Sequence, residues 1–297
     1  MTRIYRTSRT GTRPPRASTH RSFRDAALQN ALKSPVFINF GVAGPNGVRL
    51  SVVSKKGLPV YKWDKSIKRA LVVVAHPDDV DFGSAGTVAF LTNRGVDVAY
   101  CLVTSGDAGG DDSTESREER IAIREDEQTA AAKEVGVTDL TFLHWPDGRV
   151  ETTMALRREN ARVIRSHRPH LVITQSPERN YDRIFSSHPD HMATGEATLR
   201  AVYPDARNPH AFPELVREGF KPHTVDEVWL SGVSPTMVVD ITKTFDRKYA
   251  ALRRHASQVG NRKGLKKMMR TWAGDTAKRA GMKKGKLAEG FRVIATS

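Results

Sequence analysis

The sequence predicts an α/β protein with a Rossmann-like, mainly parallel sheet and helices on both of its faces. Three observations predict this class. From residue 70 onward, short apolar runs alternate with helical segments of about 10–20 residues. The first run, Leu71–Ala75, is apolar throughout, as expected of a strand buried on both faces. Polar motifs follow the runs, where open α/β sheets bind their ligands.

Two segments precede this alternating pattern. Residues 1–34 are rich in Arg, Ser and Thr and poor in apolar residues, so we expect a basic, disordered arm. Residues 35–69 are expected to form a short β-rich extension, with a hairpin turn at Pro45-Asn46-Gly47. The main domain then covers 70–258, and 259–297 form a basic C-terminal extension.

Apolar runs and helical patterning place the elements of the main domain. We expect strands over 70–75, 97–103, 139–143, 171–175, 226–231 and 236–240. We expect helices over 84–94, 115–135, 152–167, 189–202 and 242–258. Cys101 lies in the second strand, which predicts a buried residue rather than a nucleophile.

Charge is unevenly divided along the 297 residues, whose net charge is +15. Residues 1–69 hold 15 Lys/Arg against 2 Asp/Glu, and residues 243–297 hold 16 against 3. Residues 70–242 hold 17 against 28, so an acidic domain lies between basic flanks that offer weak contact to a polyanion. We expect a cytoplasmic protein, because the sequence has a single cysteine, no apolar run of membrane-spanning length and no apolar region of the signal-peptide type. The sequence does not predict the oligomeric state.

The first polar motif, His76-Pro77-Asp78-Asp79, directly follows the strand at 70–75. Because Pro77 has no N–H, the strand's ladder stops there and the polar side chains emerge at its carboxyl end. A His and two Asp at this edge can hold a divalent metal and leave one carboxylate to handle a proton. The alternative is that Asp78 and Asp79 only cap the next helix.

The second polar motif is His188-Pro189-Asp190-His191. Pro189 suits the first position of a helix capped by Ser187 or His188, which would set His188 and His191 on one helical face. A catalytic zinc takes three ligands drawn from His and carboxylate and keeps a fourth position for water. One His and one Asp from the first motif, with one His from the second, complete that set. The alternative is a structural histidine.

Two glycine-containing segments lack the motifs that would predict a nucleotide or a calcium ion as ligand. Gly83-Ser84-Ala85-Gly86 lacks the dinucleotide-binding spacing and no phosphate-binding loop motif occurs, so nothing supports a nucleotide cofactor. The loop 106–112 has Asp112 where a calcium loop needs Gly, which excludes calcium. We expect this loop to form an acidic rim at the substrate entrance.

With both histidine motifs in place, residues 69–258, together with the Ala288-Glu289-Gly290-Phe291 segment near the end, resemble the LmbE-like, or PIG-L, family of zinc-dependent N-acetylglucosaminyl deacetylases and related amidases. The matching segments, in order, are A-H-P-D-D at 75–79, Gly83…Gly86-Thr87, Thr104-Ser105-Gly106-Asp107, Arg124…Glu127 before Ala130-Ala131-Ala132, Pro146-Asp147-Gly148, H-P-D-H at 188–191 and His255-Ala256-Ser257-Gln258. The two histidine motifs are specific, and the other segments gain weight from their order.

The resemblance implies a role for each residue of the two motifs. His76, Asp79 and His191 would bind the metal, which would be Zn²⁺ with Fe²⁺ as the alternative. Asp78 would be the general base. His188 would stabilise the oxyanion or protonate the leaving amine, and Asp190 would orient it.

Three residues on the loops and helices at the rim are candidate substrate contacts, because ligands are commonly read by such loops: Asp147, Arg124 and Asp107. For Arg124 the alternative is a helix-surface pair with Glu127, and for Asp147 it is a plain Asp-Gly turn.

The resemblance predicts hydrolysis of an N-acyl group, N-acetyl above all, from an amino sugar or its conjugate. The alternatives are an amidase acting on another N-acylated metabolite or thiol conjugate, and a non-catalytic polyanion-binding protein. Two positions depart from the family pattern: Val80 stands where many members have an acid, with Asp81 one place later. Ser186 stands where some members have a Tyr, and Tyr181 is the candidate substitute.

Overall fold

In the described part of the chain, seven strands form one sheet in the order β3-β2-β1-β4-β5-β7-β6. They are β1 Arg69–Val74, β2 Asp97–Thr104, β3 Asp139–Trp145, β4 Leu171–Gln175, β5 Glu227–Ser231, β6 Met237–Asp240 and β7 Ala288–Ala295. The first five pair in parallel, whereas β7 is antiparallel to both β5 and β6. The predicted mainly parallel α/β class is confirmed, and each of the six expected strands is present.

The computed structural model describes residues 57–110, 114–181, 184, 187–260 and 262–296. The predicted arm over 1–34 and the hairpin turn at 45–47 lie outside these residues, as does most of the predicted extension over 35–69. Among the described helices, none is long and apolar enough to cross a membrane.

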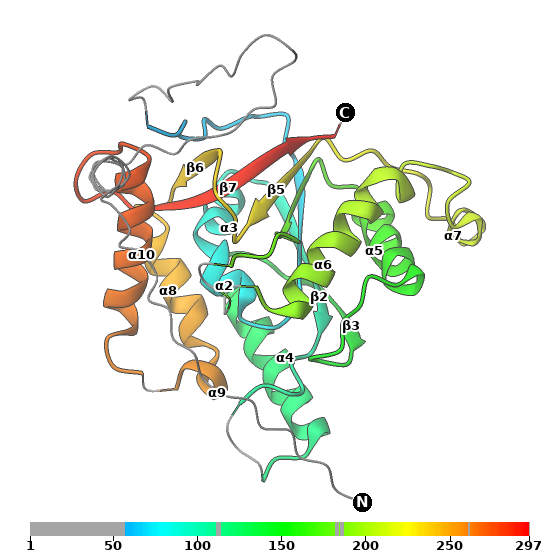
Figure 1. Ribbon diagram of the computed structural model, residues 1–297, viewed down its shortest axis with the longest axis horizontal. Coiled ribbons are helices and arrows are strands. Elements are labelled where there is room, and N and C mark those ends of the chain that lie inside the picture. Colours follow the sequence, from blue (N-terminus) through cyan, green and yellow to red (C-terminus); the bar gives the residue numbers. More distant parts are fainter. Residues whose placement is uncertain (1–56, 111–113, 182–183, 185–186, 261, 297) are drawn as a thin grey trace, which may run out of the picture. The chain divides into compact units, whose positions relative to one another are not determined.

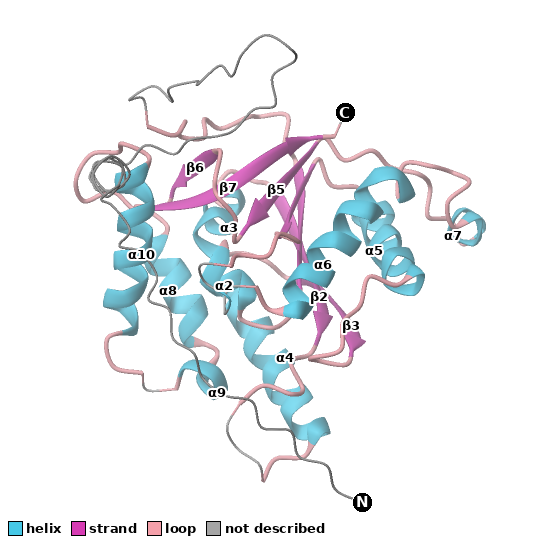
Figure 2. Cartoon of the chain, viewed as in Figure 1, coloured by secondary structure: helices cyan, strands magenta, loops and turns pink. Residues whose placement is uncertain are grey.

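Helices cover both faces of the sheet, as Figures 1 and 2 show. They are α2 Asp79–Gly83, α3 Ala85–Thr92, α4 Arg117–Glu134, α5 Met154–His167, α6 Pro189–Arg200, a π-helical turn η2 Ala201–Asp205, α7 Pro213–Arg217, α8 Phe245–Arg253, α9 Ala256–Val259 and α10 Leu265–Arg279. Alternate residues of β1 enter two cores: Val72 packs with residues of α3, α4, α8 and α10, and Leu71 packs with residues of α5 and α6. This alternation explains why the run is apolar throughout.

A local capping motif explains where α4, the helix that follows the predicted rim loop, begins. Ser116 and Glu119 form a reciprocal capping box at the start of α4, in which each side chain accepts the other residue's backbone N–H. Two of the expected helices differ in extent from the structure. The segment 84–94 contains only α3, with α2 before it, and 242–258 contains α8 and α9 with a break at Arg254 and His255.

The C-terminal region differs most from the expectation of a separate extension over 259–297. Helix α10 buries Leu265 and Met269 in the core of the sheet, and β7 lies between β5 and β6. A boundary at residue 258 would therefore remove the strand that joins β6 to the rest of the sheet. Charge concealed this part of the fold, because the exposed face of α10 carries the lysines and only its inner face is apolar.

A buried carboxylate fixes β7 to the helix that follows the first histidine motif. Glu289 of β7 accepts hydrogen bonds from the backbone N–H groups of Gly86 and Thr87, in the first turn of α3, and from the Thr87 hydroxyl. Lys248 of α8 completes the charge pair with Glu289. Because these donors open α3, the carboxylate acts as the cap that the Ser84 side chain does not supply.

Cys101 is confirmed as a buried residue of β2. Burial raises the pKa of its thiol to about 12, so the thiolate is disfavoured. This agrees with a packing role.

Candidate functional site

The candidate site begins where β1 ends, at the carboxyl edge of the sheet. Strand order reverses direction around β1 and β4, and such switch points are where open α/β sheets bind ligands. After Val74 the chain turns through His76, Pro77 and Asp78 and enters α2 at Asp79. The predicted strand-to-helix turn is therefore present.

Three side chains converge on one point at this edge, coming from β1–α2 and from α6. Nδ1 of His76 lies 3.2 Å from Nε2 of His191 and 3.3 Å from Oδ2 of Asp79. Nε2 of His191 lies 3.1 Å from Oδ1 of the same carboxylate. Although burial opposes its ionisation, the two imidazoles hold the pKa of Asp79 well below its usual range.

The other ring nitrogen of His76 faces two further carboxylates. Its Nε2 lies 3.0 Å from Oδ1 of Asp147 and 3.3 Å from Oδ2 of Asp190. Burial disfavours a charged imidazole, but the hydrogen bonds with Asp147, Asp190 and Asp79 outweigh it and raise the pKa of His76 to about 12. Ligand atoms of His76, Asp147 and Asp190 lie close enough together to hold a metal ion. The same is true of the ring nitrogens of His76, His188 and His191.

His188 caps α6, with Pro189 in the first helical position as expected. The backbone N–H of Asp190 donates to Nδ1 of His188 at 3.3 Å. Burial, followed by the neighbouring imidazoles of His76 and His191, lowers the pKa of His188. A neutral His188 whose Nδ1 accepts a hydrogen bond carries its proton on Nε2, a tautomer assigned here from that bond.

The carboxylate of Asp190 differs from its expected place. It accepts the backbone N–H groups of Gly148 and Val150 at 2.7 and 3.3 Å and contacts His76, rather than the ring of His188. Only its backbone N–H orients His188. The carboxylate is directed this way because Asp190 lies in the first turn of α6, facing the loop that follows β3.

Asp78 lies beside the three converging side chains and has an unusual main chain. Its φ of 83° and ψ of −24° lie in the left-handed region, which costs free energy for a residue other than glycine. Burial and the charge of Asp79 outweigh the opposing effects of Arg124, His255 and His76 and raise the pKa of Asp78 to about 7. A carboxyl group with that pKa exchanges protons near neutrality.

Arg124 does not lie where a substrate contact was expected. Its side chain is buried, with the residue 3% exposed. Nη1 donates to the carbonyl oxygen of Gly106 at 2.8 Å and Nη2 donates to that of Pro77 at 2.7 Å, with Oδ2 of Asp78 at 3.3 Å. Arg124 therefore holds the main chain before Asp78 and contacts the Asp78 carboxylate. None of these contacts is the alternative surface pair with Glu127.

Asp107 and Asp147 connect two rim loops to each other. The backbone N–H of Asp147 donates to Oδ1 of Asp107 at 3.2 Å, and the N–H of Ala108 donates to Oδ2 of Asp147 at 3.1 Å. Asp107 also pairs with Arg117. Both carboxylates are thus engaged with protein groups, and Asp147 contacts His76 rather than open solvent.

The remaining expectations concern the loop before α6. Tyr181 is 85% exposed, and Ser186 lies outside the described residues. Gln128 was not among the expected site residues, yet its side-chain Oε1 accepts the backbone N–H of Asp78 at 2.9 Å. The feature that marks Gln128 is the complete burial of a polar side chain on α4, and burial cannot be read from a sequence.

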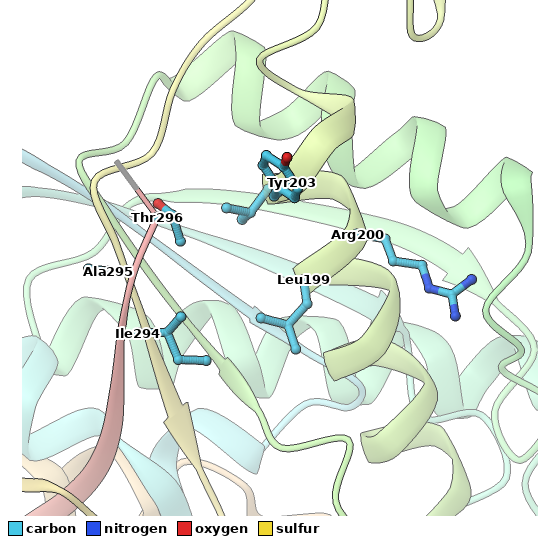
Figure 3. Close-up of a pocket in the computed structure, with 7 residues that line it drawn as sticks. Leu199, Arg200, Tyr203, Ile294, Ala295 and Thr296 are labelled. Atoms are coloured by element: carbon cyan, nitrogen blue, oxygen red, sulfur yellow. The ribbon is translucent and has the colours of Figure 1, made fainter. Parts of the chain in front are cut away.

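A separate pocket of about 520 Å³ lies between the end of α6, η2 and β7 (Figure 3). Its lining is mainly apolar and consists of Leu199, Arg200, Val202, Tyr203, Ile294, Ala295 and Thr296. It contains none of the predicted site residues.

Comparison with known proteins identifies relatives of the chain. The family model described as "PIG-L: GlcNAc-PI de-N-acetylase" matches residues 71–202. Diacetylchitobiose deacetylase of Thermococcus kodakarensis is 31% identical over 209 residues, which cover 70% of this chain and 76% of that protein. Probable N-acetyl-α-D-glucosaminyl L-malate deacetylase 2 of Bacillus anthracis is 31% identical over 204 residues, covering 67% and 84%.

Solved structures agree with these relatives. N,N'-diacetylchitobiose deacetylase from Pyrococcus horikoshii, complexed with its inhibitor MPG, superposes with a TM-score of 0.71 at 28% identity, covering 78% of this chain and 85% of that one. The hydratase GalB from Pseudomonas putida KT2440 superposes with a TM-score of 0.65 at 22% identity, covering 78% and 98%. The second likeness concerns the fold alone, since one fold supports different reactions.

Proposed function

The chain belongs to the PIG-L family, and from that premise we propose that it is a metal-dependent hydrolase that removes the N-acetyl group of an amino sugar or amino-sugar conjugate. One observation carries this proposal. Metal-donor atoms of His76, Asp79 and His191 converge next to the partly buried carboxyl group of Asp78, whose side chain is 16% exposed. Amide hydrolysis needs both an activated water and a group to take its proton.

His76, Asp79 and His191 are the residues that would hold the metal, and their donor atoms fit this assignment. Ligand atoms lie about 2.0–2.1 Å from a tetrahedral zinc, which places them roughly 3.3 Å from each other. Here Nδ1 of His76 and Nε2 of His191 are 3.2 Å apart, and they lie 3.3 and 3.1 Å from the Oδ2 and Oδ1 oxygens of Asp79, respectively. When bound, the metal would lower the pKa of a water molecule to about 7 and polarise the acyl oxygen. We propose Zn²⁺, with Fe²⁺ as the alternative for a two-His, one-carboxylate site.

Asp78 is the proposed general base. It neighbours the metal ligand Asp79 in sequence, yet its left-handed main chain directs it differently. A pKa of about 7 supports this role, because a base titrating near the working pH takes a proton and can later return it to the leaving amine.

His188 is the proposed hydrogen-bond donor to the developing oxyanion; the alternative role, protonation of the leaving amine, would need its imidazolium form. The hydrogen bond from the Asp190 backbone to Nδ1 favours a proton on Nε2, which then serves as the donor. A neutral donor suits this position, since burial, followed by the neighbouring imidazoles of His76 and His191, lowers the pKa of His188.

The substrate class rests on the relatives, which by name deacetylate diacetylchitobiose, N-acetylglucosaminyl malate and N-acetylglucosaminyl inositol. The test is amine release from these three compounds by the purified full chain, with and without chelation and Zn²⁺ reloading. Release that needs the metal supports the proposal. No release from any of them, at any metal loading, would contradict it.

Two alternative functions suggested by the sequence can be tested separately. An amidase acting on another acyl group would prefer propionyl, butyryl or thiol-conjugate analogues to the N-acetyl compounds. A polyanion-binding role would draw on the basic flanks, which include the exposed Lys263, Lys267, Lys278, Lys283 and Lys284 around α10. Salt-sensitive DNA binding without any amine release would favour it. The expected cytoplasmic location stays a prediction.

A further inference from the structure

The strained main chain of Asp78 needs groups that hold it. A left-handed conformation in a non-glycine residue persists when its surroundings over-determine it. Here the N–H of Asp78 donates to Oε1 of Gln128 at 2.9 Å, and the preceding carbonyl, that of Pro77, accepts from Arg124 at 2.7 Å. The Pro77–Asp78 peptide group is therefore held at both its N–H and its C=O by side chains of α4.

Gln128 and Arg124 lie one helical turn apart, on the same face of α4. Gln128 is fully buried, and its amide has a single workable orientation. Oε1 must face the N–H of Asp78, so Nε2 faces Oδ2 of Asp81, to which it donates at 3.1 Å. Any shift of the Asp81 carboxylate would therefore move the acceptor that holds Asp78.

His255, which is distant in the sequence, forms a hydrogen bond with the Asp81 carboxylate. Its Nε2 lies 2.8 Å from the same Oδ2 atom of Asp81, and both residues are 0% exposed. The imidazole must donate through Nε2, because the carboxylate oxygen accepts. His255 precedes α9, and α9 is itself fastened to α4 by Ser257, whose N–H and hydroxyl donate to Glu127 at 2.7 and 2.6 Å.

We infer that His255 is a positioning residue for Asp78. Through Asp81 and Gln128 it fixes the left-handed main chain of Asp78, and so the direction of the carboxyl group beside the metal ligands. Among the hydrogen bonds and ion pairs of the described residues, His255 contacts Asp81 and none of the proposed metal-ligand side chains. The inference rests on the proposed function, because it assumes that Asp78 is the base.

The test compares two substitutions at position 255 in the full chain loaded with Zn²⁺. His255→Leu removes the donor, and His255→Gln keeps a side-chain N–H that can reach Asp81. We expect His255→Leu to lose 10–100-fold in kcat, with KM changed by less than about threefold, and His255→Gln to recover most of the loss. Gln128→Met breaks the same chain of hydrogen bonds at its other end and should give a similar kcat.

Readouts other than rate separate positioning from general damage. Zn²⁺ content should stay near one per chain, and the visible spectrum of the Co²⁺-loaded protein should match wild type. Thr198→Val is the matched control, because it breaks a fully buried hydrogen bond with Asn160 on the opposite face of the sheet. It should lower the free energy of unfolding and leave kcat unchanged.

Each outcome decides between the claims. Wild-type kcat in both His255→Leu and Gln128→Met, with Asp78→Asn inactive, overturns the inference and leaves the proposed function intact. Loss of metal or an altered Co²⁺ spectrum in His255→Leu also overturns it, because His255 would then act on the metal site. Normal amine release by Asp78→Asn, or none by the wild type, overturns the proposed function itself.

Discussion

Oδ1 of Asp147 lies 3.0 Å from Nε2 of His76, the ring nitrogen opposite the one that faces Asp79 and His191. A carboxylate in this position keeps the proton of a neutral imidazole on Nε2 and leaves the Nδ1 lone pair to the metal. Asp147 thus links the loop after β3 to the strand that carries the first motif.

Asp147→Asn should weaken metal binding about 10–100-fold, because the amide orients His76 less well and removes a negative charge. Zn²⁺ titration against a chelator of known affinity measures the change. With saturating Zn²⁺, most activity should return. An unchanged affinity would mean that Asp147 contacts the substrate instead, as the sequence suggested.

Asp78 and Asp79 should separate into different phenotypes. Asp79→Ala should lose metal and activity together, as should His76→Ala and His191→Ala. Asp78→Ala should retain metal and lose on the order of 10²–10⁴ in kcat, with a far smaller change in KM. Metal analysis alongside steady-state kinetics checks this, and the reverse pattern would exchange the two roles.

His188→Ala should lower kcat by about 10²–10³-fold, the range for removing one oxyanion donor, and should leave metal content unchanged. His188 also lies close to the other two histidines, with ring centroids 5.0 Å from His76 and 5.1 Å from His191. Loss of the metal in this variant would instead identify His188 as a ligand.

Lys248→Met should destabilise the fold by about 3 kcal/mol, because it leaves the buried Glu289 carboxylate without its cation. Denaturant unfolding measures the change. Lys286→Met is the control: its pair with Asp240 is partly exposed, so the cost should stay below about 1 kcal/mol. Equal effects at both positions would show that burial does not set the strength of the Glu289 pair.

Deletion of residues 1–34 should leave kcat on a small substrate nearly unchanged, since the family match lies elsewhere in the chain. Any binding to heparin should weaken in the deletion and fall steeply with added NaCl, as counterion release requires. A large loss of kcat would show that this segment contributes to the active site.

The sequence predicted the parts of the site whose signal is local. An apolar run stopped by Pro77 defined β1 and its edge, and Pro189 placed His188 as the cap of α6. Both motifs needed only neighbouring residues to be interpreted. The fold class followed for the same reason, because alternating strands and helices are a local pattern.

What the sequence did not predict depends on contacts between distant segments. Gln128 matters because of the strained peptide at Asp78, and that strain appears only in the folded chain. Arg124 was assigned to the substrate because burial of a cation is not visible from helical spacing. β7 was missed because Gly290 and the charges of Glu289 and Arg292 interrupt its apolar pattern.

The place of β7 between β5 and β6 has a consequence for biosynthesis. A ribosome delivers β5 and β6 before β7, so neither can pair with it while the intervening chain is being made. During that interval both strands have unpaired backbone edges, and the first turn of α3 lacks the Glu289 cap. The nascent chain therefore joins β6 to the sheet and completes the cap of α3 only after β7 has emerged from the ribosome.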